Sequence, residues 1–266
     1  MIRIQRSVER YPGGDPAAGI ETRHALSFGP HYDPDNLRFG ALLACNEERL
    51  APGAGFEEHP HSHTEIVTWV VEGELTHHDT AGHTTVVRPG DLQRLSSADG
   101  VRHVERNDGD VPLVFVQMWL APLAPGGEPS YEVVRGAGDS GPYDLPAADA
   151  RLRVHRLGAG ESAPVPAADF AYVHVVRGTV RLMEPETPKE PGEPTGLVER
   201  GEPTGPEGAR TAGEGAPAAG PGSRAGVPLA PGDAVRITGA TGGSLVATTG
   251  AEVLVWEMRD WRKGLG

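Results

Sequence analysis

Two stretches of this chain repeat each other, and the repeat limits what the chain can fold into. The sequence VVEGEL at 70–75 resembles VVRGTV at 175–180, and RPGD at 88–91 resembles APGD at 230–233. Self-similarity between two halves indicates two related structural units in tandem. We therefore expect an N-terminal domain at 1–135 and a C-terminal domain at 136–266.

Short apolar runs separated by turn residues predict β-strands in both units. The runs are rich in Val, Ile, Thr and Leu, and clusters of Gly, Pro and Asp lie between them. No window sustains an apolar period of 3.6 residues, so any helix should be short. This pattern is typical of an all-β sandwich or barrel. The clearest predicted strands are Ile66–Val71, Thr84–Arg88, Leu113–Leu120, Leu152–Leu157, Ala171–Val176, Asp233–Thr238 and Glu252–Met258.

The second unit carries a long insertion between its two repeat motifs. Pro, Gly, Glu and Ala dominate residues 184–226, and GEPTG occurs twice, at 192–196 and 201–205. With so few large apolar residues, this segment should be disordered. It could dock a protein partner as an extended Pro-rich stretch, or it could be a low-complexity expansion of one β-loop. We favour the expansion, because compositional bias alone rarely identifies a partner.

Composition excludes several classes of function. The formal charge is −13, with 24 basic and 37 acidic residues, so direct binding to nucleic acid is not expected. The single cysteine, Cys45, can form neither an internal disulfide nor a thiolate zinc site. The first 15 residues lack the apolar run of a signal peptide, and no stretch has the apolar length to cross a bilayer. We expect a soluble, cytoplasmic monomer.

Four residues in the first unit form a candidate metal site. His59 and His61 flank a proline, and His103 and Glu105 follow later with the same spacing of two. In extended chain, residues two apart project to one face, so each pair can present two ligands together. Neutral imidazole and carboxylate suit Fe, Mn, Ni, Cu or Zn. Taken singly, an exposed His-rich loop and an exposed strand pair would be the simpler interpretations.

The second unit lacks the same ligands. Measured from the repeated Gly and Pro, the offsets of the four candidate ligands fall on positions without suitable donor atoms: Pro164, Pro166, Leu245 and Ala247. We therefore predict one metal ion per chain. The isolated His155 and His174 are interpreted as structural. Because unperturbed imidazoles titrate near pH 6.5, we expect metal affinity to fall as the pH drops toward 5.

Other polar residues near the site have less specific interpretations. His63 could be an alternative ligand, an acid/base group or a solvent-facing side chain, and we favour exposure. His77, His78 and His83 surround an expected turn, so we interpret them as the polar tip of a hairpin. Cys45 is most simply a small core residue.

The order of these motifs resembles the signature of the pirin family. The matching residues are His59-Pro60-His61, Glu65, Glu72-Gly73, Pro89-Gly90-Asp91-Leu92-Gln93, His103-Val104-Glu105 and Gln117-Met118-Trp119. The resemblance is strong over about residues 40–122 and covers the second half in outline. It implies an all-β bicupin: two tandem cupin domains, each a jelly roll or double-stranded β-helix, the second one degenerate.

The resemblance also implies how the metal is bound. His59, His61, His103 and Glu105 would hold one divalent ion, usually Fe(II), with Ni, Cu, Mn, Co or Zn as alternatives. Glu65, which stands where cupins usually have their carboxylate ligand, would then be structural.

The resemblance implies two functions of different class. One is a dioxygenase, similar to quercetin 2,3-dioxygenase, that cleaves a flavonol or related enolisable substrate with O₂ and uses Glu105 as ligand and proton acceptor. The other is a non-enzymatic, iron-binding, redox-responsive regulator that acts through a protein partner. A metal-binding protein with neither activity is the third interpretation. The residues after His-Pro-His, Ser62-His63-Thr64, are more polar than is common in pirins. We favour the enzyme, because an open His/carboxylate site is costly to keep merely for packing.

Overall fold

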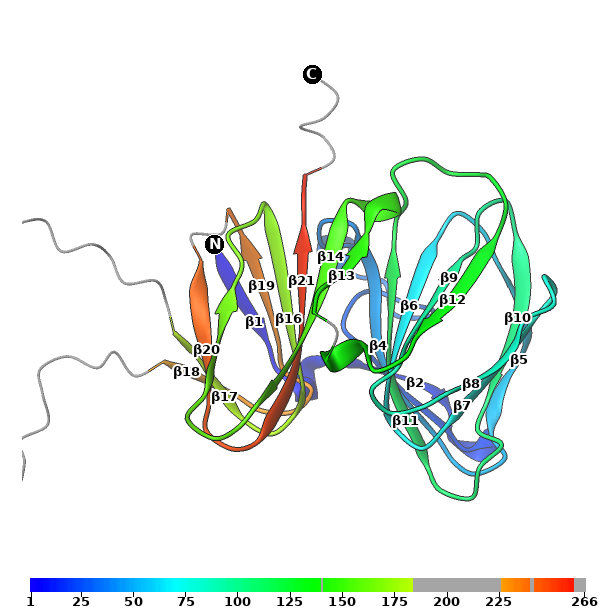
Figure 1. Ribbon diagram of the computed structural model, residues 1–266, viewed down its shortest axis with the longest axis horizontal. Helices are drawn as coiled ribbons and strands as arrows, with labels where there is room; N and C mark the ends of the chain where they lie inside the picture. Colours follow the sequence, from blue (N-terminus) through cyan, green and yellow to red (C-terminus); the bar gives the residue numbers. More distant parts are fainter. Residues whose placement is uncertain (140, 184–225, 240–241, 261–266) are drawn as a thin grey trace, which may run out of the picture.

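The computed structural model describes residues 1–266 except 140, 184–225, 240–241 and 261–266 (Figure 1). The described residues form β-strands and five short 3-10 turns and contain no α-helix. No helix in this part of the chain has the length and apolar character to cross a membrane. The 3-10 turns are Ser7–Glu9, Pro16–Ala18, Pro34–Asn36, Ala137–Asp139 and Pro146–Ala148.

The first barrel consists of a seven-stranded sheet, in the order β12-β9-β6-β11-β4-β3-β2, and a four-stranded sheet, in the order β5-β10-β7-β8. All neighbours are antiparallel. The strands are β2 (Tyr11–Asp15), β3 (Ile20–His24), β4 (Leu42–Leu50), β5 (Gly55–His61), β6 (Glu65–Glu72), β7 (Leu75–Asp79), β8 (Thr84–Val87), β9 (Leu92–Ser96), β10 (Val101–Arg106), β11 (Leu113–Leu120) and β12 (Ser130–Val134).

The second barrel repeats this arrangement with a six-stranded sheet, β1-β19-β16-β21-β14-β13, and a four-stranded sheet, β15-β20-β17-β18. The strands are β1 (Ile2–Gln5), β13 (Tyr143–Leu145), β14 (Ala150–Leu157), β15 (Ser162–Val165), β16 (Phe170–Arg177), β17 (Val180–Met183), β18 (Val227–Leu229), β19 (Ala234–Thr238), β20 (Gly243–Ala247) and β21 (Ala251–Met258). Each of the seven runs predicted above coincides with a strand, and the two four-stranded sheets have matching orders. The predicted bicupin architecture is confirmed.

The first strand does not follow the predicted division at residue 135. Strand β1 pairs with β19, so the N-terminal end completes the sheet of the second barrel. It occupies the edge position that β12 occupies beside β9 in the first barrel. The chain therefore begins in the second barrel with β1, forms the first barrel with β2–β12 and then completes the second barrel (Figure 1).

The repeated Pro-Gly-Asp turns make the same contacts in both halves. Asp91 accepts a hydrogen bond from the backbone N–H of Arg88, and Asp233 accepts the corresponding bond from Ala230. Each Asp also pairs with an arginine beside an edge strand: Asp91 with Arg135 after β12, and Asp233 with Arg6 after β1 (2.7 Å). In each barrel, the Asp of the Pro-Gly-Asp turn therefore forms an ion pair with the Arg that follows the edge strand, β12 or β1.

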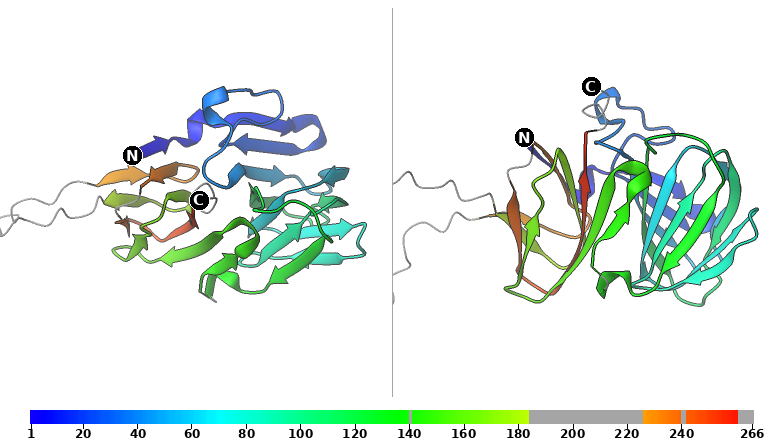
Figure 2. Two further views of the ribbon diagram at one scale, coloured as in Figure 1. Left: turned by 90° about the horizontal axis from the view of Figure 1, so that it is seen from above. Right: turned by 45° about the horizontal axis from the view of Figure 1, so that its top comes forward.

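The two larger sheets pack face to face and enclose an apolar core between the barrels (Figure 2). Both Trp69 of β6 and Trp256 of β21 are fully buried there, and Cys45 lies in the same core, as predicted. Burying a large apolar side chain contributes about 1.5–3 kcal/mol, so this interface holds the barrels together firmly. His174 is buried beside it, with Nδ1 2.7 Å from Arg10 Nη2, and is structural as expected.

The interiors of the two barrels differ in chemistry. The second is filled by apolar side chains, among them Val173, Leu182 and Leu245. Buried polar side chains gather in the first instead, and they are Thr22, His24, Asn46, Glu48, Thr68, His77, Gln93, His103, Glu105 and Gln117. Burying a polar group costs free energy unless it has hydrogen-bond or metal partners. So many buried polar side chains therefore indicate a binding or catalytic site inside the first barrel.

Residues 184–225 lie outside the described part of the chain, but the strands on either side are informative. Strand β17 pairs with β18 in antiparallel register, with Leu182 opposite Val227. The two ends of the segment are therefore adjacent, as in a hairpin. Replacing 184–226 by a short Gly-containing turn should leave the thermal midpoint and metal content nearly unchanged. Calorimetry and elemental analysis would check this, and a large fall in either quantity would contradict it.

Candidate metal centre

Strand β10 carries the centre of the candidate site and lies between β5 and β7. Its residues alternate, so that His103 and Glu105 are buried on one face while Arg102 is exposed on the other. His103 lies opposite His59 on β5, and Glu105 lies opposite His77 on β7. A register shift between His103 and Glu105 on the β5 side marks a bulge, a feature common next to functional sites.

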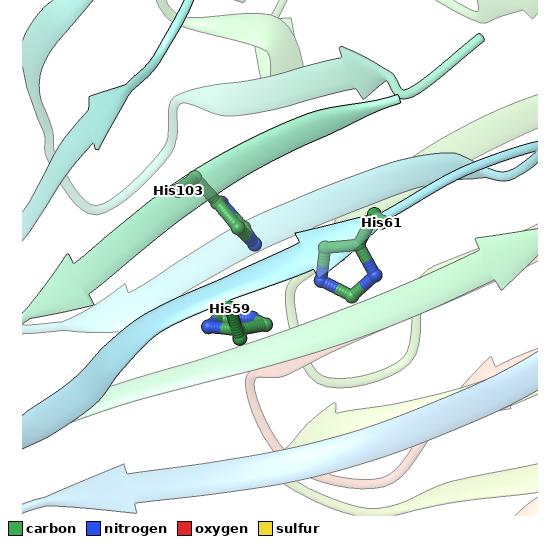
Figure 3. Close-up of side chains that lie close together, drawn as sticks. All are labelled: His59, His61 and His103. Carbon is green, nitrogen blue, oxygen red and sulfur yellow. The ribbon is translucent and has the colours of Figure 1, made fainter. Parts of the chain in front are cut away.

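Three of the four predicted ligands come together directly. The donor atoms of His59, His61 and His103 lie within 4.8 Å of one another. Their ring centroids are 4.5 to 4.9 Å apart, and the three side chains lie close together (Figure 3). We call these three residues the outer group.

The hydrogen bonds of the outer group leave nitrogen lone pairs free for a metal. His59 Nδ1 lies 2.8 Å from the carbonyl oxygen of Glu57, which can only accept, so this ring nitrogen carries the proton. In a neutral ring Nε2 is then a lone-pair donor, the usual arrangement of a metal-binding histidine. His61 Nε2 and both ring nitrogens of His103 are buried without a hydrogen-bond partner. These orphaned atoms fit a divalent metal.

Electrostatics favour the neutral, metal-binding form of His61 and His103. Burial, with the neighbouring His103 and His59, lowers the pKa of His61 to about 4. Burial also lowers the pKa of His103, against the opposing effect of Glu105. The carboxyl group of Glu105 is fully buried, which by itself would raise its pKa. Nearby His103 and His77, together with the hydrogen bonds from Gln117 and Gln93, outweigh that effect and keep the pKa below its usual value.

Two amides donate to Glu105, which is not among the close donor atoms of the outer group. Gln93 Nε2 donates to Oε1 at 3.0 Å, and Gln117 Nε2 donates to Oε2 at 2.8 Å. The carboxylate instead forms a second group of close donor atoms with His103 and His77. We call these three residues the inner group. His103 belongs to both groups and so links the fourth predicted ligand to the other three.

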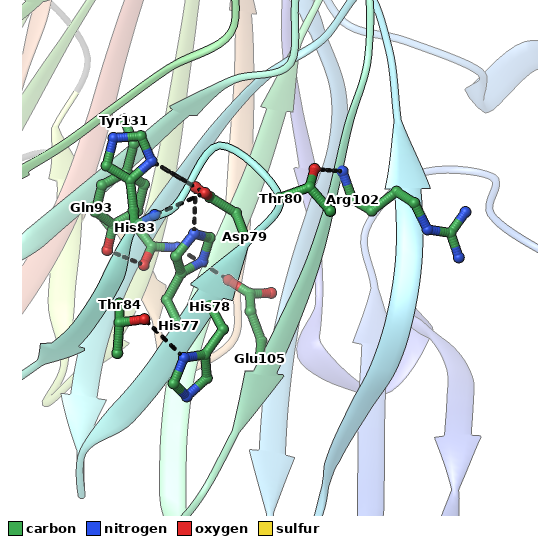
Figure 4. A network of polar contacts seen from close by, with 10 residues as sticks. All are labelled: His77, His78, Asp79, Thr80, His83, Thr84, Gln93, Arg102, Glu105 and Tyr131. Carbon is green, nitrogen blue, oxygen red and sulfur yellow. Dashed lines mark hydrogen bonds and ion pairs between the residues drawn. The ribbon is translucent and has the colours of Figure 1, made fainter.

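The interpretation of His77 as part of an exposed hairpin tip is wrong. His77 is 0% exposed and points into the barrel, while its neighbour His78 is exposed and bonds Thr84 (Figure 4). The alternation along β7 explains the difference, since the tip begins only after Asp79. His83 follows the turn and contacts Asp79 at 2.9 Å.

The other predictions near the site agree with the structure. His63 is exposed and has φ +54°, outside the regular strands. Glu65 is structural: it accepts from Arg94 Nε at 2.8 Å and from Ser96 Oγ at 2.7 Å. It belongs to neither ligand group.

Sequence reasoning missed the residues that support Glu105. Gln93 and Gln117 stand in motifs that matched the family signature, yet no role followed from the spacing. Tyr131 donates from its hydroxyl to Gln93 Oε1 at 3.0 Å, and Asp79 accepts from His77 at 3.1 Å. The alternation of Leu75, His77 and Asp79 was the available signal for an inward-facing histidine.

Among the described residues, both groups of potential metal ligands lie in the first barrel, and none lies in the second. Strand β15 pairs with β20 as β5 pairs with β10. Pro164 lies on β15, and Leu245 and Ala247 are buried on β20. Pro164, Leu245 and Ala247, found by their offsets, therefore lie on the two strands that correspond to β5 and β10. That one ion is bound per chain stays a prediction.

The lowered pKa values refine the expected dependence of metal binding on pH. A histidine with a lowered pKa stays neutral to a lower pH, so protons compete with the metal only there. Since the pKa of His61 is about 4, most of the metal should remain at pH 5.5 and be released as the pH approaches 4. Elemental analysis after dialysis at stepped pH would check this. Half-release at pH 6.5 or above would contradict it.

Comparison with known proteins places this geometry in a family. A family model described as Pirin matches residues 3–120. The chain is 34% identical to "Putative quercetin 2,3-dioxygenase Rv0181c" of Mycobacterium tuberculosis, over 97% of this chain and 95% of that protein. It is also 34% identical over 160 residues to a quercetin 2,3-dioxygenase of Escherichia coli, which covers 59% of this chain and 68% of the relative.

Solved structures agree in fold. The crystal structure of YhhW from Escherichia coli superimposes with a TM-score of 0.75 at 25% identity, covering 97% of both chains. A structure of the bacterial pirin YhhW in complex with nickel(II) superimposes with a TM-score of 0.74 and covers 97% of this chain and 99% of that one. With its bicupin fold and its His/Glu cluster, the chain belongs to the pirin family.

Proposed function

We propose that the protein is a metal-dependent dioxygenase that cleaves a flavonol or a related enolisable substrate with O₂. The observation that carries the proposal is the cluster itself: three imidazoles with lone pairs free in the first barrel, where His103 also lies close to the carboxylate of Glu105. Relatives with the name quercetin 2,3-dioxygenase support the reaction class. Fold alone would not, because cupin-like barrels host many functions.

His59, His61, His103 and Glu105 would hold the metal, and Fe(II) is our proposed ion. Imidazole and carboxylate together suit Fe(II) and do not exclude Ni(II), which the YhhW structure contains. When bound, such an ion polarises a substrate oxygen and supplies the chemistry with O₂. The protein's own contribution is to fix the ligands and the proton acceptor.

Glu105 would take the substrate proton. It lies beside His103 in the inner group, and its lowered pKa keeps it ionised at neutral pH. The amides of Gln93 and Gln117 hold both carboxylate oxygens, so the acceptor does not need to reorganise during proton transfer. A substrate hydroxyl group that passes its proton to Glu105 would become an enolate.

Aromatic side chains lie next to the outer histidines and could hold a planar substrate. Trp119 packs edge-on against His61 with centroids 4.8 Å apart, and Phe28 packs against Trp119 at 5.1 Å. The indole is fixed because Trp119 Nε1 donates to Gln117 Oε1 at 3.0 Å. The same glutamine donates to Glu105, so one residue orients both the aromatic contact and the proton acceptor.

Oxygen consumption tests the proposal. Protein loaded anaerobically with Fe(II), and separately with Ni(II), Mn(II) and Co(II), should consume O₂ when quercetin is added, with loss of the flavonol absorbance. A panel of flavonols and simpler enolisable phenols would define the substrate. If fully loaded protein consumes no O₂ with any of them, the enzymatic proposal fails.

A further inference from the structure

We propose that the first barrel contains a second metal position, formed by the inner group His77, His103 and Glu105, which overlaps the outer position at His103. The donor atoms of the inner group lie within 4.8 Å of one another, as do those of the outer group. All three inner residues are at most 1% exposed, whereas His59 and His61 are partly exposed. The inner position is therefore the more enclosed one.

Asp79 prepares His77 to act as a ligand. Its carboxylate lies 3.1 Å from His77 Nε2, and it already accepts the backbone N–H of His83 at 3.0 Å (Figure 4). Because a carboxylate accepts, the Nε2 of His77 carries the ring proton, and Nδ1 has the lone pair. That Nδ1 is buried without a hydrogen-bond partner. Metal-binding histidines commonly donate one ring N–H to a carboxylate in this way, which leaves the other ring nitrogen free for the metal.

The inner ligands are also fixed in place. Tyr131 stacks on His77 with ring centroids 4.4 Å apart and an interplanar angle of 15°. The hydroxyl of Tyr131 donates to Gln93, and Gln93 donates to Glu105 (Figure 4). One chain of contacts therefore holds both His77 and the carboxylate opposite it on β10. Two imidazoles and one carboxylate form a ligand set for Fe(II), Co(II), Ni(II) or Zn(II).

The shared His103 determines how the two positions relate. An ion that keeps His103 and Glu105 could exchange His59 and His61 for His77, so a single ion could occupy either the partly exposed outer position or the enclosed inner one. One ion per chain is therefore expected in the wild type. The inner position should become visible when the outer ligands are removed.

Titration with Co(II), followed by its visible absorption and in the absence of substrate, tests this inference. The variant His59→Ala/His61→Ala keeps the whole inner group and should still bind one Co(II) per chain. Adding His77→Ala should weaken the remaining binding by about 10²-fold or more. Adding His78→Ala instead, at the exposed neighbouring position, should change nothing. Circular dichroism would confirm that each variant is folded.

Two outcomes would overturn the inner position. Either folded His59→Ala/His61→Ala binds no Co(II), or the addition of His77→Ala leaves its Co(II) affinity unchanged. Should His77→Ala fail to fold, His77→Gln retains an N–H donor for Asp79 and must give the same loss of affinity. The readout involves neither O₂ nor a flavonol, so its result is independent of whether the dioxygenase proposal holds.

Discussion

Protein that carries both His59→Ala and His103→Ala should contain almost no metal after purification, whereas the wild type should contain one ion per chain. His103 belongs to the outer and the inner group, so its loss removes a donor from both. The loss of His59 leaves only His61 in the outer group. One remaining donor in the outer group and two in the inner group are too few to retain an ion through purification, and elemental analysis would measure the difference.

The matched control for this variant is His155→Ala. His155 lies on β14 of the second barrel, is partly buried and belongs to neither ligand group. It should leave the metal content at the wild-type value. Circular dichroism and the thermal midpoint must show that the double variant is folded. Full occupancy of the folded double variant, or two ions per wild-type chain, would refute the assignment.

The sequence predicted those strands whose composition follows the ordinary β pattern. Apart from Gln117, the run Leu113–Leu120 consists of Val, Phe, Met, Trp and Leu, because β11 is buried on both faces. Strand β5 was recognised only as the place of two ligands, since its sequence GFEEHPH is polar and contains a proline. The pairing of β1 with β19 was beyond local reasoning, because the partners are more than 220 residues apart.

The part of the candidate site that could be predicted is the part that follows from the spacing of residues along the chain. Pairs of ligands two residues apart on neighbouring strands led to His59, His61, His103 and Glu105, and the structure brings the three histidines together. His77 was missed because a histidine near an expected turn looks exposed, and only the register of β7 against β10 shows that it faces Glu105. The hydrogen bonds from Gln93 and Gln117 depend on side-chain geometry that no sequence pattern encodes.

Those two amides also make Glu105→Gln an informative substitution. Both oxygens of Glu105 accept from side-chain amides, and a glutamine can offer only one acceptor atom there. One amide would then face another donor, so the variant should lose some metal affinity and some stability. Activity must therefore be compared at equal metal loading.

With metal loading equal, Glu105→Gln should lower flavonol turnover by about 10²-fold or more, the usual contribution of a general base. The amide can still coordinate weakly but can no longer accept the substrate proton. Oxygen consumption with quercetin measures the effect. The control is Glu65→Gln, a buried carboxylate in the same barrel that pairs with Arg94 and belongs to neither ligand group. Its turnover per bound metal should match the wild type.

Each result separates the possible roles of Glu105. Equal turnover by the wild type and Glu105→Gln would mean that Glu105 is not the base, even if the protein is a dioxygenase. A loss in both Glu105→Gln and Glu65→Gln would indicate damage to the barrel rather than a lost proton acceptor. If the wild type shows no turnover when fully loaded with metal, the carboxylate of Glu105 serves only as a metal ligand. The regulator interpretation would then require Glu105→Gln to change the binding of a protein partner between the oxidised and reduced metal.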